Sequence, residues 1–244
     1  MRLSAAIERV KRFARRFKER DRTRYLLARR YLTGQGIEIG ALHNPLRTNA
    51  RVRYVDRLSR ADLREQYPEL SALPVVDPDI IDDGEKLGTV PQGSQDFIIA
   101  NHFIEHCADP IGTLSVFVSR LRPGGIIYMG VPDKRDCFDR DRPSTTFEHL
   151  EQDHADGGAA SRRGHFEEFA RLSHFQGKGT ELEIQTLAQH WLDIDYSIHF
   201  HVWTFEEFGA FLNRVAHSYV PELELVDQKR NLDEGIFILK RRTL

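Results

Sequence analysis

The stretch Gly36-Ile37-Glu38-Ile39-Gly40 carries the strongest indication of the fold. It is a short apolar run with one acid inside it, and the break Thr33-Gly34-Gln35-Gly36 precedes it. Apolar runs of this length beside glycine-containing turns are typical of buried strands. A glycine directly after a strand lets the backbone approach a ligand closely. The stretch therefore predicts a buried strand with a ligand site at its carboxyl end.

Strands and helices continue to alternate along the chain. Ser59 is a suitable N-cap for a helix with Asp62 in its first turn, and another helix is predicted over 111–121. The strands between the helices are apolar runs without strict alternation, as in parallel sheets covered on both faces. These further strands are predicted over 52–56, 75–81, 96–100 and 126–131. The pattern predicts an α/β domain with a mostly parallel sheet.

The character of the sequence changes after Pro132. The following residues are polar and rich in His, Asp and Arg, which predicts an inserted helical cap on the substrate side. The α/β pattern resumes with a helix over 204–215 and two strands, over 223–227 and 235–239, close enough for an antiparallel hairpin. The predicted parts are a basic N-terminal helix over 1–32, an α/β core over 33–133, the cap over 134–200 and the end of the core over 201–244.

The composition is that of an ordinary globular protein. Of 244 residues, 40% are hydrophobic and 30% are charged. No apolar run approaches the roughly 20 residues needed to cross a bilayer. The N-terminus lacks the apolar region and cleavage site of a secretory signal. The two cysteines, Cys107 and Cys137, show neither zinc-type spacing nor a disulfide framework, so we expect a cytoplasmic protein.

The charge is distributed unevenly. Residues 1–32 hold twelve Lys/Arg against three Asp/Glu, whereas the rest of the chain holds 23 against 34. Ile7, Val10, Ala14 and Phe17 recur at helical spacing within this basic segment. One interpretation is a peripheral contact with an anionic membrane or nucleic acid. The other is a helix that packs its apolar stripe on the domain and leaves its arginines in solvent.

Four polar segments follow predicted strands. In an open parallel sheet, ligands bind beyond the carboxyl ends of the strands, where the strand order reverses. Asp56, which ends the second strand, is suited to accept hydrogen bonds from ribose hydroxyls. The four segments are Glu38-Ile39-Gly40, Asp56, Asp82-Asp83-Gly84-Glu85 and Asn101-His102.

From Gly36 to Asp133 the chain resembles the class I methyltransferases that depend on S-adenosylmethionine (SAM), especially the methyltransferase type 11 group. Each motif alone is weak, but their order and spacing are specific. The motifs are the first strand, Asp56, the run Asp96-Phe97-Ile98-Ile99-Ala100-Asn101-His102-Phe103-Ile104-Glu105-His106, and Leu121-Arg122-Pro123-Gly124-Gly125. The resemblance implies a Rossmann-like fold, a mostly parallel seven-stranded sheet with an antiparallel end hairpin, and SAM as cofactor.

The resemblance also implies roles for single residues. Glu38 and Gly40 would line the methionine part of SAM. Asp56 would bind the ribose, and Asp83-Gly84 would flank the adenine. Asn101 would lie beside the methionine moiety or the transferable methyl group. The full set of predicted cofactor-binding residues is Glu38, Gly40, Ala41, Asp56, Arg57, Asp82, Asp83, Gly84, Asn101 and His102.

The chain departs from this family directly after Gly40. The family's loop usually continues with further glycines, whereas Ala41-Leu42-His43-Asn44-Pro45 stands here. Side chains thus occupy positions where bare backbone is usual. Asn44 adopts a left-handed conformation more readily than most residues, so we expect it to provide that conformation in the loop.

Histidines are the candidates for proton transfer. In His199-Phe200-His201 the two imidazoles are predicted to point to one side of an extended segment, and His149 and Asp153 share one face of a predicted helix. Paired histidines with an acid can hold a divalent metal or act as a base, and an ordinary pKa near 6.5 suits the second role. We assign no metal ligands and predict the base among His102, His106, His149, His154, His199 and His201.

Two other patterns suggest different chemistry. The run His102-Phe103-Ile104-Glu105-His106 matches the inverted zinc-protease motif. That motif needs both histidines one helical turn apart and facing a metal, whereas here it follows a strand and stops at Asp109-Pro110. The cap arginines suit a phosphate or carboxylate, although arginines in a polar insertion are more often solvated. They are Arg140, Arg142, Arg162 and Arg163.

The sequence thus predicts a SAM-dependent methyltransferase acting on a small polar acceptor, with a histidine as general base. By analogy within the family, the acceptor is a sugar, a glycan or a natural-product intermediate. One alternative is a SAM-binding regulator or scaffold, suggested by the altered loop over 41–45. A second is an RNA methyltransferase that uses the basic segment over 1–32. A third, a NAD-dependent oxidoreductase, lacks Gly-x-Gly-x-x-Gly after the first strand.

Overall fold

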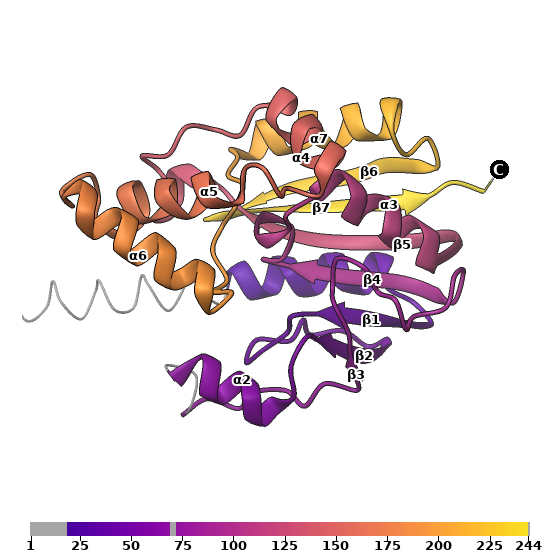
Figure 1. The fold of residues 1–244 in the computed structure, drawn as a ribbon. Coiled ribbons are helices and arrows are strands. Elements are labelled where there is room, and N and C mark those ends of the chain that lie inside the picture. The colour runs from indigo at the N-terminus through magenta and orange to yellow at the C-terminus, as the bar shows by residue number, and fades with distance from the viewer. Residues whose placement is uncertain (1–18, 69–71, 244) are drawn as a thin grey trace, which may run out of the picture.

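The computed structural model describes residues 19–68 and 72–243. Its centre is one seven-stranded sheet in the order β3-β2-β1-β4-β5-β7-β6, with helices against both faces (Figure 1). The strands are β1 (Gln35–Ile39), β2 (Arg51–Asp56), β3 (Ile80–Ile81), β4 (Gln95–Asn101), β5 (Leu121–Pro132), β6 (Leu223–Asn231) and β7 (Glu234–Arg241). The helices are α2 (Arg60–Gln66), α3 (Pro110–Arg120), α4 (Phe147–Asp156), α5 (Arg162–Glu168), α6 (Glu181–Asp193) and α7 (Phe205–Ser218).

The direction of the strands confirms the predicted fold. Strands β3, β2, β1, β4 and β5 run parallel, and β7 is antiparallel to both β5 and β6. The chain moves outward from β1 through β2 to β3 and then returns to β4, on the other side of β1. The strand order therefore reverses between β1 and β4, which is where such sheets bind ligands.

The central strands bury both of their faces. Ile37, Ile98 and Met129 belong to the larger core cluster, which α3 and α7 cover. Their neighbours in sequence, such as Ile99 and Tyr128, belong to a second cluster on the opposite face. Strands buried on both sides gain no benefit from alternating polar residues, which is why the sequence shows continuous apolar runs.

A helix over 19–31 covers the second face of the sheet (indigo in Figure 1). Ala28 and Leu32 are buried in the second cluster, and Arg24 is only 5% exposed. This part of the basic segment packs on the domain and turns one arginine inward. The predicted apolar stripe at Ile7, Val10, Ala14 and Phe17 lies outside the described residues.

Two strands differ in length from the prediction. Only Ile80–Ile81 pairs with β2, so the strand predicted to begin at residue 75 was wrong over its first five positions. Pro74 and Pro78 have no N–H to donate to a ladder, which explains the loss of pairing there. In contrast, β5 already begins at Leu121 and includes the Arg122-Pro123-Gly124-Gly125 turn, with a register shift where Leu121 pairs with Gln95.

The cap consists of α4, α5 and α6, inserted between β5 and α7. Helices α5 and α6 lie beyond the edge at which the parallel strands end, whereas α4 lies beside α7 and contacts α3 (Figure 1). A π-helical turn over Phe169–His174 follows α5, and Phe166, Ile184 and Trp191 form a separate core within the cap. No helix in the described part of the chain is long and apolar enough to cross a membrane.

Candidate functional site

The four predicted segments meet at the reversal point of the sheet. The N–H of Gly40 donates to the carbonyl of Val55 at 3.0 Å, which joins the end of β1 to the end of β2. The N–H of Asp82 donates to the carbonyl of Asp56, also at 3.0 Å, which joins β3 to β2. On the other side of β1, Asn101 ends β4. The sequence-predicted positions therefore share one edge of the sheet.

Glu38 anchors the loop that follows β1. Its carboxylate is 1% exposed and accepts the N–H of Leu46 through both oxygens, at 2.8 and 3.1 Å. Burial raises the pKa of Glu38 to about 7, although that hydrogen bond opposes the shift. Gly40 and Leu42 have positive φ angles, of 62° and 47°. Leu42 provides the left-handed conformation of this loop, so its assignment to Asn44 was wrong.

The carboxylates after β2 and β3 differ in their hydrogen-bond and ion-pair partners. The Oδ1 atom of Asp56 accepts the N–H of Arg57 at 2.8 Å, and burial raises the pKa of this carboxyl. Asp82 accepts both the N–H and the hydroxyl of Thr89, at 2.8 and 2.6 Å, so it caps a turn. Asp83 is 45% exposed and pairs with Lys86 at 2.7 Å. Asp82 and Asp83 are thus engaged by protein side chains, whereas the hydrogen bond of Asp56 is to a backbone N–H.

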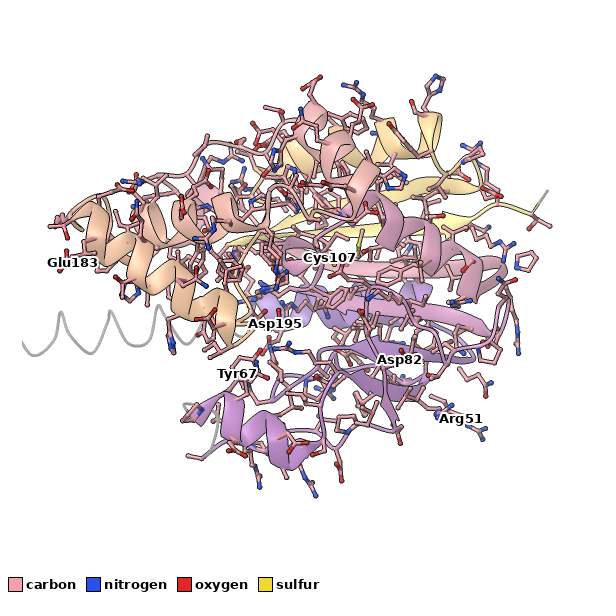
Figure 2. All side chains as sticks on the ribbon, in the orientation of Figure 1. Arg51, Tyr67, Asp82, Cys107, Glu183 and Asp195 are labelled. Carbon is pink, nitrogen blue, oxygen red and sulfur yellow. The ribbon has the colours of Figure 1, made fainter. Side chains whose placement is uncertain are left out.

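Arg57 connects the cofactor edge to the cap. Its guanidinium pairs with Asp195 at 3.0 Å, and Arg162 of α5 also pairs with Asp195. Figure 2 shows Asp195 at the end of α6, where the cap comes down to the sheet. Ala41 is half-buried beside this edge, and a side chain added at Gly84 would come within 2.8 Å of Ile39 and Phe103.

Asn101 and His102 end β4 in different environments. Both polar atoms of the Asn101 amide are buried and have no hydrogen-bond partner among the described residues. His102 has a φ of 50°, and its Nε2 lies 2.9 Å from the carboxylate of Glu234. Arg24 from the N-terminal helix pairs with the same carboxylate. Although burial alone raises the pKa of Glu234, His102 and Arg24 hold it well below its usual range.

The cap places a buried acid, Asp139, beside His199. The Nδ1 of His199 lies 2.6 Å from Oδ2 of Asp139, and Arg142 and Ser173 contact Oδ1 of Asp139 at 2.9 and 3.0 Å. Although burial alone raises the pKa of Asp139, its hydrogen bond and charge interaction with His199 lower it to about 2. A buried acid that orients an imidazole is the arrangement found behind general bases.

Two further groups lie beside this histidine. The ring of His106 stands edge-on to that of His199, with 4.7 Å between centroids, and its Nδ1 lies 2.8 Å from the carbonyl of Ile198. Burial and the neighbouring His199 lower the pKa of His106 to about 3, so His106 is neutral. Glu105 is 1% exposed, and burial raises its pKa. Its Oε1 atom is 4.0 Å from Nε2 of His199.

The six predicted catalytic histidines are thus divided among four places. His102 belongs to the Arg24–Glu234 network, and His154 pairs with Asp109 at 2.9 Å. His106 and His199 lie together. His149 and His201 lie with Asp153 and His165 in a different cluster. His199 and His201 thus belong to two different clusters of titratable side chains.

The zinc-protease pattern and the cap arginines can also be placed. His102 has a left-handed backbone and only a short 3-10 turn, Ile104–His106, follows it, so the histidines of the zinc-protease pattern are not one helical turn apart. Of the cap arginines, Arg142 is 2% exposed and donates to Glu168 and to the carbonyls of His199 and Phe200. It therefore holds the site together and is not available to a substrate anion.

Asp139, Glu105 and Glu234 are the residues that the sequence did not identify. Each is at most 1% exposed, although carboxylates are rarely buried unless they are paired. Asp139 stands in an ordinary polar stretch, and Glu234 begins β7 directly after the hairpin turn. Their partners are 60 and 132 residues away, at His199 and His102. No local signal marks such a pairing.

The surface is also hollowed at the opposite end of the sheet. Two open hollows, of about 650 and 640 Å³, share Gly34, Asp96 and Arg122 in their lining. Arg122 pairs with Asp96 at 2.9 Å, and Asp96 also accepts the N–H of Gln35. These polar groups satisfy one another at the amino ends of the strands, away from the reversal point.

Fold, reversal point and the acids gathered there define a Rossmann-like enzyme for a nucleoside cofactor. A family model described as a methyltransferase domain matches residues 10–215. The chain belongs to this methyltransferase family, and its cofactor is SAM. The NAD-dependent oxidoreductase considered from the sequence is thereby set aside.

Solved structures of similar fold are distant in sequence. A Rhodobacter sphaeroides structure named for the Zn-dependent alcohol dehydrogenases is 17% identical over 93% of this chain and 90% of that one, with a TM-score of 0.54. SAM-dependent methyltransferases from Thermotoga maritima and Methanosarcina mazei are 12% and 14% identical. They cover 96% and 88% of this chain and 96% of each of those chains, with TM-scores of 0.47 and 0.46. None of the curated proteins matches the sequence significantly.

Proposed function

We propose that this methyltransferase methylates a polar small molecule and that His199 is its general base. The observation that carries the proposal is the 2.6 Å contact between Nδ1 of His199 and the buried carboxylate of Asp139. Asp139 accepts the Nδ1 proton, which leaves Nε2 as the proton acceptor. No hydrogen bond to that Nε2 is recorded among the described residues, so it is available to a substrate hydroxyl or amine.

The residues at the strand ends fit SAM. A side chain added at Gly40 would meet nothing nearer than Phe103, at 3.9 Å, so the backbone there is open to a ligand. The buried Asn101 amide has no hydrogen-bond partner in the described part of the chain, and buried polar groups ordinarily have one, so a ligand can satisfy it. The proposal assigns the methionine part to Gly40 and Asn101 and the ribose to Asp56.

When bound, SAM supplies a methyl group activated by a positively charged sulfur. The chain contributes position and proton transfer. Gly40 and Asn101 fix the cofactor, and the dyad of Asp139 and His199 fixes the acceptor opposite it. As the acceptor atom takes the methyl group, Nε2 of His199 removes its proton, and the negative charge of Asp139 stabilises the imidazolium that forms.

The surroundings of His199 favour an acceptor that combines polar groups with a flat apolar face. Phe138 is 55% exposed, and its ring centroid lies 4.8 Å from that of His199. Glu105 and His106 each supply a polar atom within 4.8 Å of a ring nitrogen of His199. Binding sites combine an aromatic wall with a few convergent polar groups in this way. A hydroxyl-rich sugar, a glycan or a glycosylated natural-product intermediate is the acceptor class that we propose.

His199→Asn tests the base. Formation of S-adenosylhomocysteine is measured against a panel of sugars and hydroxylated natural products, and SAM affinity is measured by calorimetry. We expect kcat to fall by about 10²–10⁴-fold with unchanged SAM affinity, because a positioned base contributes about that much. The matched control is His174→Asn, an exposed cap histidine that contacts Phe175 and Trp191.

Two results would contradict the proposal. A His199→Asn enzyme with kcat within a few-fold of the wild type would remove His199 as the base. SAM binding by the wild type without turnover on any acceptor of the panel would favour the regulator or scaffold. Asp139→Asn separates orientation from charge, because the amide retains the contact with Nδ1 but reverses the tautomer that it supports.

A further inference from the structure

A second cluster of titratable side chains lies in the cap. His149 and Asp153 stand one turn apart on α4, His165 comes from α5, and His201 comes from the extended segment before α7. Each offers one ligand atom, and these four atoms lie within 4.8 Å of one another. His201 is fully buried and Asp153 is 1% exposed. The proposed methyl transfer uses none of these residues.

The atoms of this cluster converge on a common point. Nε2 of His149 lies 3.1 Å from Nε2 of His165 and 3.2 Å from Oδ2 of Asp153. That same Oδ2 lies 3.6 Å from Nε2 of His165 and 3.5 Å from Nε2 of His201. The ring of His165 is inclined by 83° to that of His149 and by 81° to that of His201. The three imidazoles therefore surround the carboxylate oxygen.

Hydrogen bonding accounts for only part of this arrangement, namely the contact between His149 and His165. Nε2 of His201 and Oδ2 of Asp153 are both buried, and neither has a hydrogen-bond partner among the described residues. Oδ2 nevertheless has three imidazole nitrogens within 3.6 Å. Buried polar atoms ordinarily have partners. Three ring nitrogens and a carboxylate oxygen converge on one point, and two of these four atoms have no hydrogen-bond partner among the described residues, which is the arrangement expected of metal ligands.

We propose that His149, Asp153, His165 and His201 bind one zinc ion with tetrahedral coordination. Zinc lies about 2.0–2.2 Å from imidazole nitrogen and carboxylate oxygen, so neighbouring ligands of a tetrahedron are roughly 3.3–3.6 Å apart. Four of the six separations between these ligand atoms run from 3.1 to 3.6 Å, and all six are within 4.8 Å. Three imidazoles and one carboxylate suit zinc better than magnesium or calcium, which prefer oxygen ligands. This proposal differs from the sequence analysis, which assigned no metal ligands.

The surroundings of the carboxylate support this assignment. The hydroxyl of Ser161 donates to Oδ1 of Asp153, which fixes the carboxylate and leaves Oδ2 for the ion.

Four protein ligands leave no open position, so the ion has a structural role. It joins the consecutive helices α4 and α5 to the segment before α7 that carries His201. The N–H groups of Phe200 and His201 both donate to the carbonyl of Glu105, at 2.8 and 3.2 Å. Zinc at this place therefore fixes the segment that also carries His199, without contacting SAM or the acceptor.

The test is metal content and metal-dependent stability of the full chain, purified without a histidine tag. We expect about one zinc per chain by mass spectrometry, retained through dialysis, and a lower Tm after removal by a strong chelator. Zinc added back should restore the Tm, and cobalt in its place should give the absorption bands of tetrahedral cobalt. His165→Gln should lose the zinc while keeping a folded circular-dichroism spectrum, because His165 is partly exposed at the edge of the cluster.

The matched control is His154→Gln, which changes a neighbouring α4 histidine that pairs with Asp109. It should keep the full zinc content. The proposal is overturned if the stripped, folded wild type takes up no zinc or cobalt. It is also overturned if His154→Gln loses as much zinc as His165→Gln, since the metal would then be bound by surface histidines. Loss of methyl transfer plays no part in this decision, so the two proposals fail independently.

Discussion

Glu38 shows how one residue can be placed correctly from sequence and still have an unexpected task. Its two oxygens hold Leu46, so it shapes the loop that distinguishes this chain from its relatives. Burial raises its pKa from 4.5 to about 7. For an acid, a pKa raised by folding gives stability that is complete below the unfolded pKa and is lost as the pH rises through the folded pKa.

The folded enzyme without SAM should therefore lose stability between pH 4.5 and pH 7 through Glu38. The loss amounts to at most about 3 kcal/mol, since one pKa unit is about 1.4 kcal/mol. Glu38→Gln keeps an acceptor for Leu46 and cannot ionise. Urea unfolding at pH 5 and pH 8 should show the variant gaining on the wild type at the higher pH. A constant difference between the two proteins would show that Glu38 is already ionised at pH 5.

Asp56 allows contact and charge to be separated. Asp56→Ala should weaken S-adenosylhomocysteine binding by about 10–100-fold, because hydrogen bonds to a charged group contribute about 1.5–3 kcal/mol. Asp56→Asn keeps an oxygen for the N–H of Arg57 and should lose less affinity. Calorimetry gives the affinity, and circular dichroism confirms that both variants fold. Unchanged affinity in a folded Asp56→Ala protein would remove Asp56 from the ribose site.

At this scale the sequence predicted residue types and strand ends better than partners. Gly40, Asp56 and Asn101 follow from the order of strands, because parallel strands bring their carboxyl ends to one edge. The partners of His102 and His199 depend on the paths of loops over many residues. Glu234 and Asp139 therefore became visible only in the folded chain.

Among the elements, the cap depends on one buried ion pair. Arg142 is 2% exposed and joins Asp139, Glu168 of α5 and the carbonyl of His199. Arg142→Met leaves Asp139 with fewer partners and should cost about 3–5 kcal/mol in the free energy of unfolding. The matched control, Arg140→Met, changes an exposed side chain two positions away and should alter stability by about 0.5 kcal/mol or less.

Urea denaturation measures the free energy of unfolding of both variants. The affinity of the folded fraction for SAM shows whether the substitution also changes the cofactor site. Arg142 contacts only the cap and the segment over 199–200, so SAM affinity should change less than stability. Equal stability of the Arg142→Met and Arg140→Met proteins would show that the buried pair does not contribute. A large loss of SAM affinity at unchanged stability would place Arg142 in the cofactor site.

The elements themselves were predictable to different degrees. Helix N-caps and apolar runs are local signals in a sequence. They identified Ser59 as an N-cap, the end hairpin, and the strands β1, β2, β4 and β5. β3 was overestimated because apolar residues such as Val75 can be buried without joining a ladder. The cap was recognised by its composition, but its separate core around Phe166 and Trp191 follows from packing between helices that no local pattern specifies.

For the whole molecule, the open question is the basic N-terminal segment. The helix over 19–31 is part of the fold, since Ala28 and Leu32 lie in the core and Arg24 pairs with Glu234. Deletion of residues 1–32 therefore removes core contacts as well as positive charge. Deletion of residues 2–18 removes seven of the twelve Lys/Arg and leaves all of these described contacts in place.

We predict that the chain without residues 2–18 keeps its Tm and SAM affinity, whereas the chain without residues 1–32 loses both.

The same two deletions decide whether the basic segment binds an anionic partner. If the full chain binds RNA or anionic vesicles, the affinity should fall steeply with salt, because each neutralised phosphate releases counterions. The shorter deletion should then abolish that binding without changing SAM affinity. Binding that survives the shorter deletion would place the anionic surface on the folded domain, and a low Tm of that variant would contradict the proposed limit of the fold.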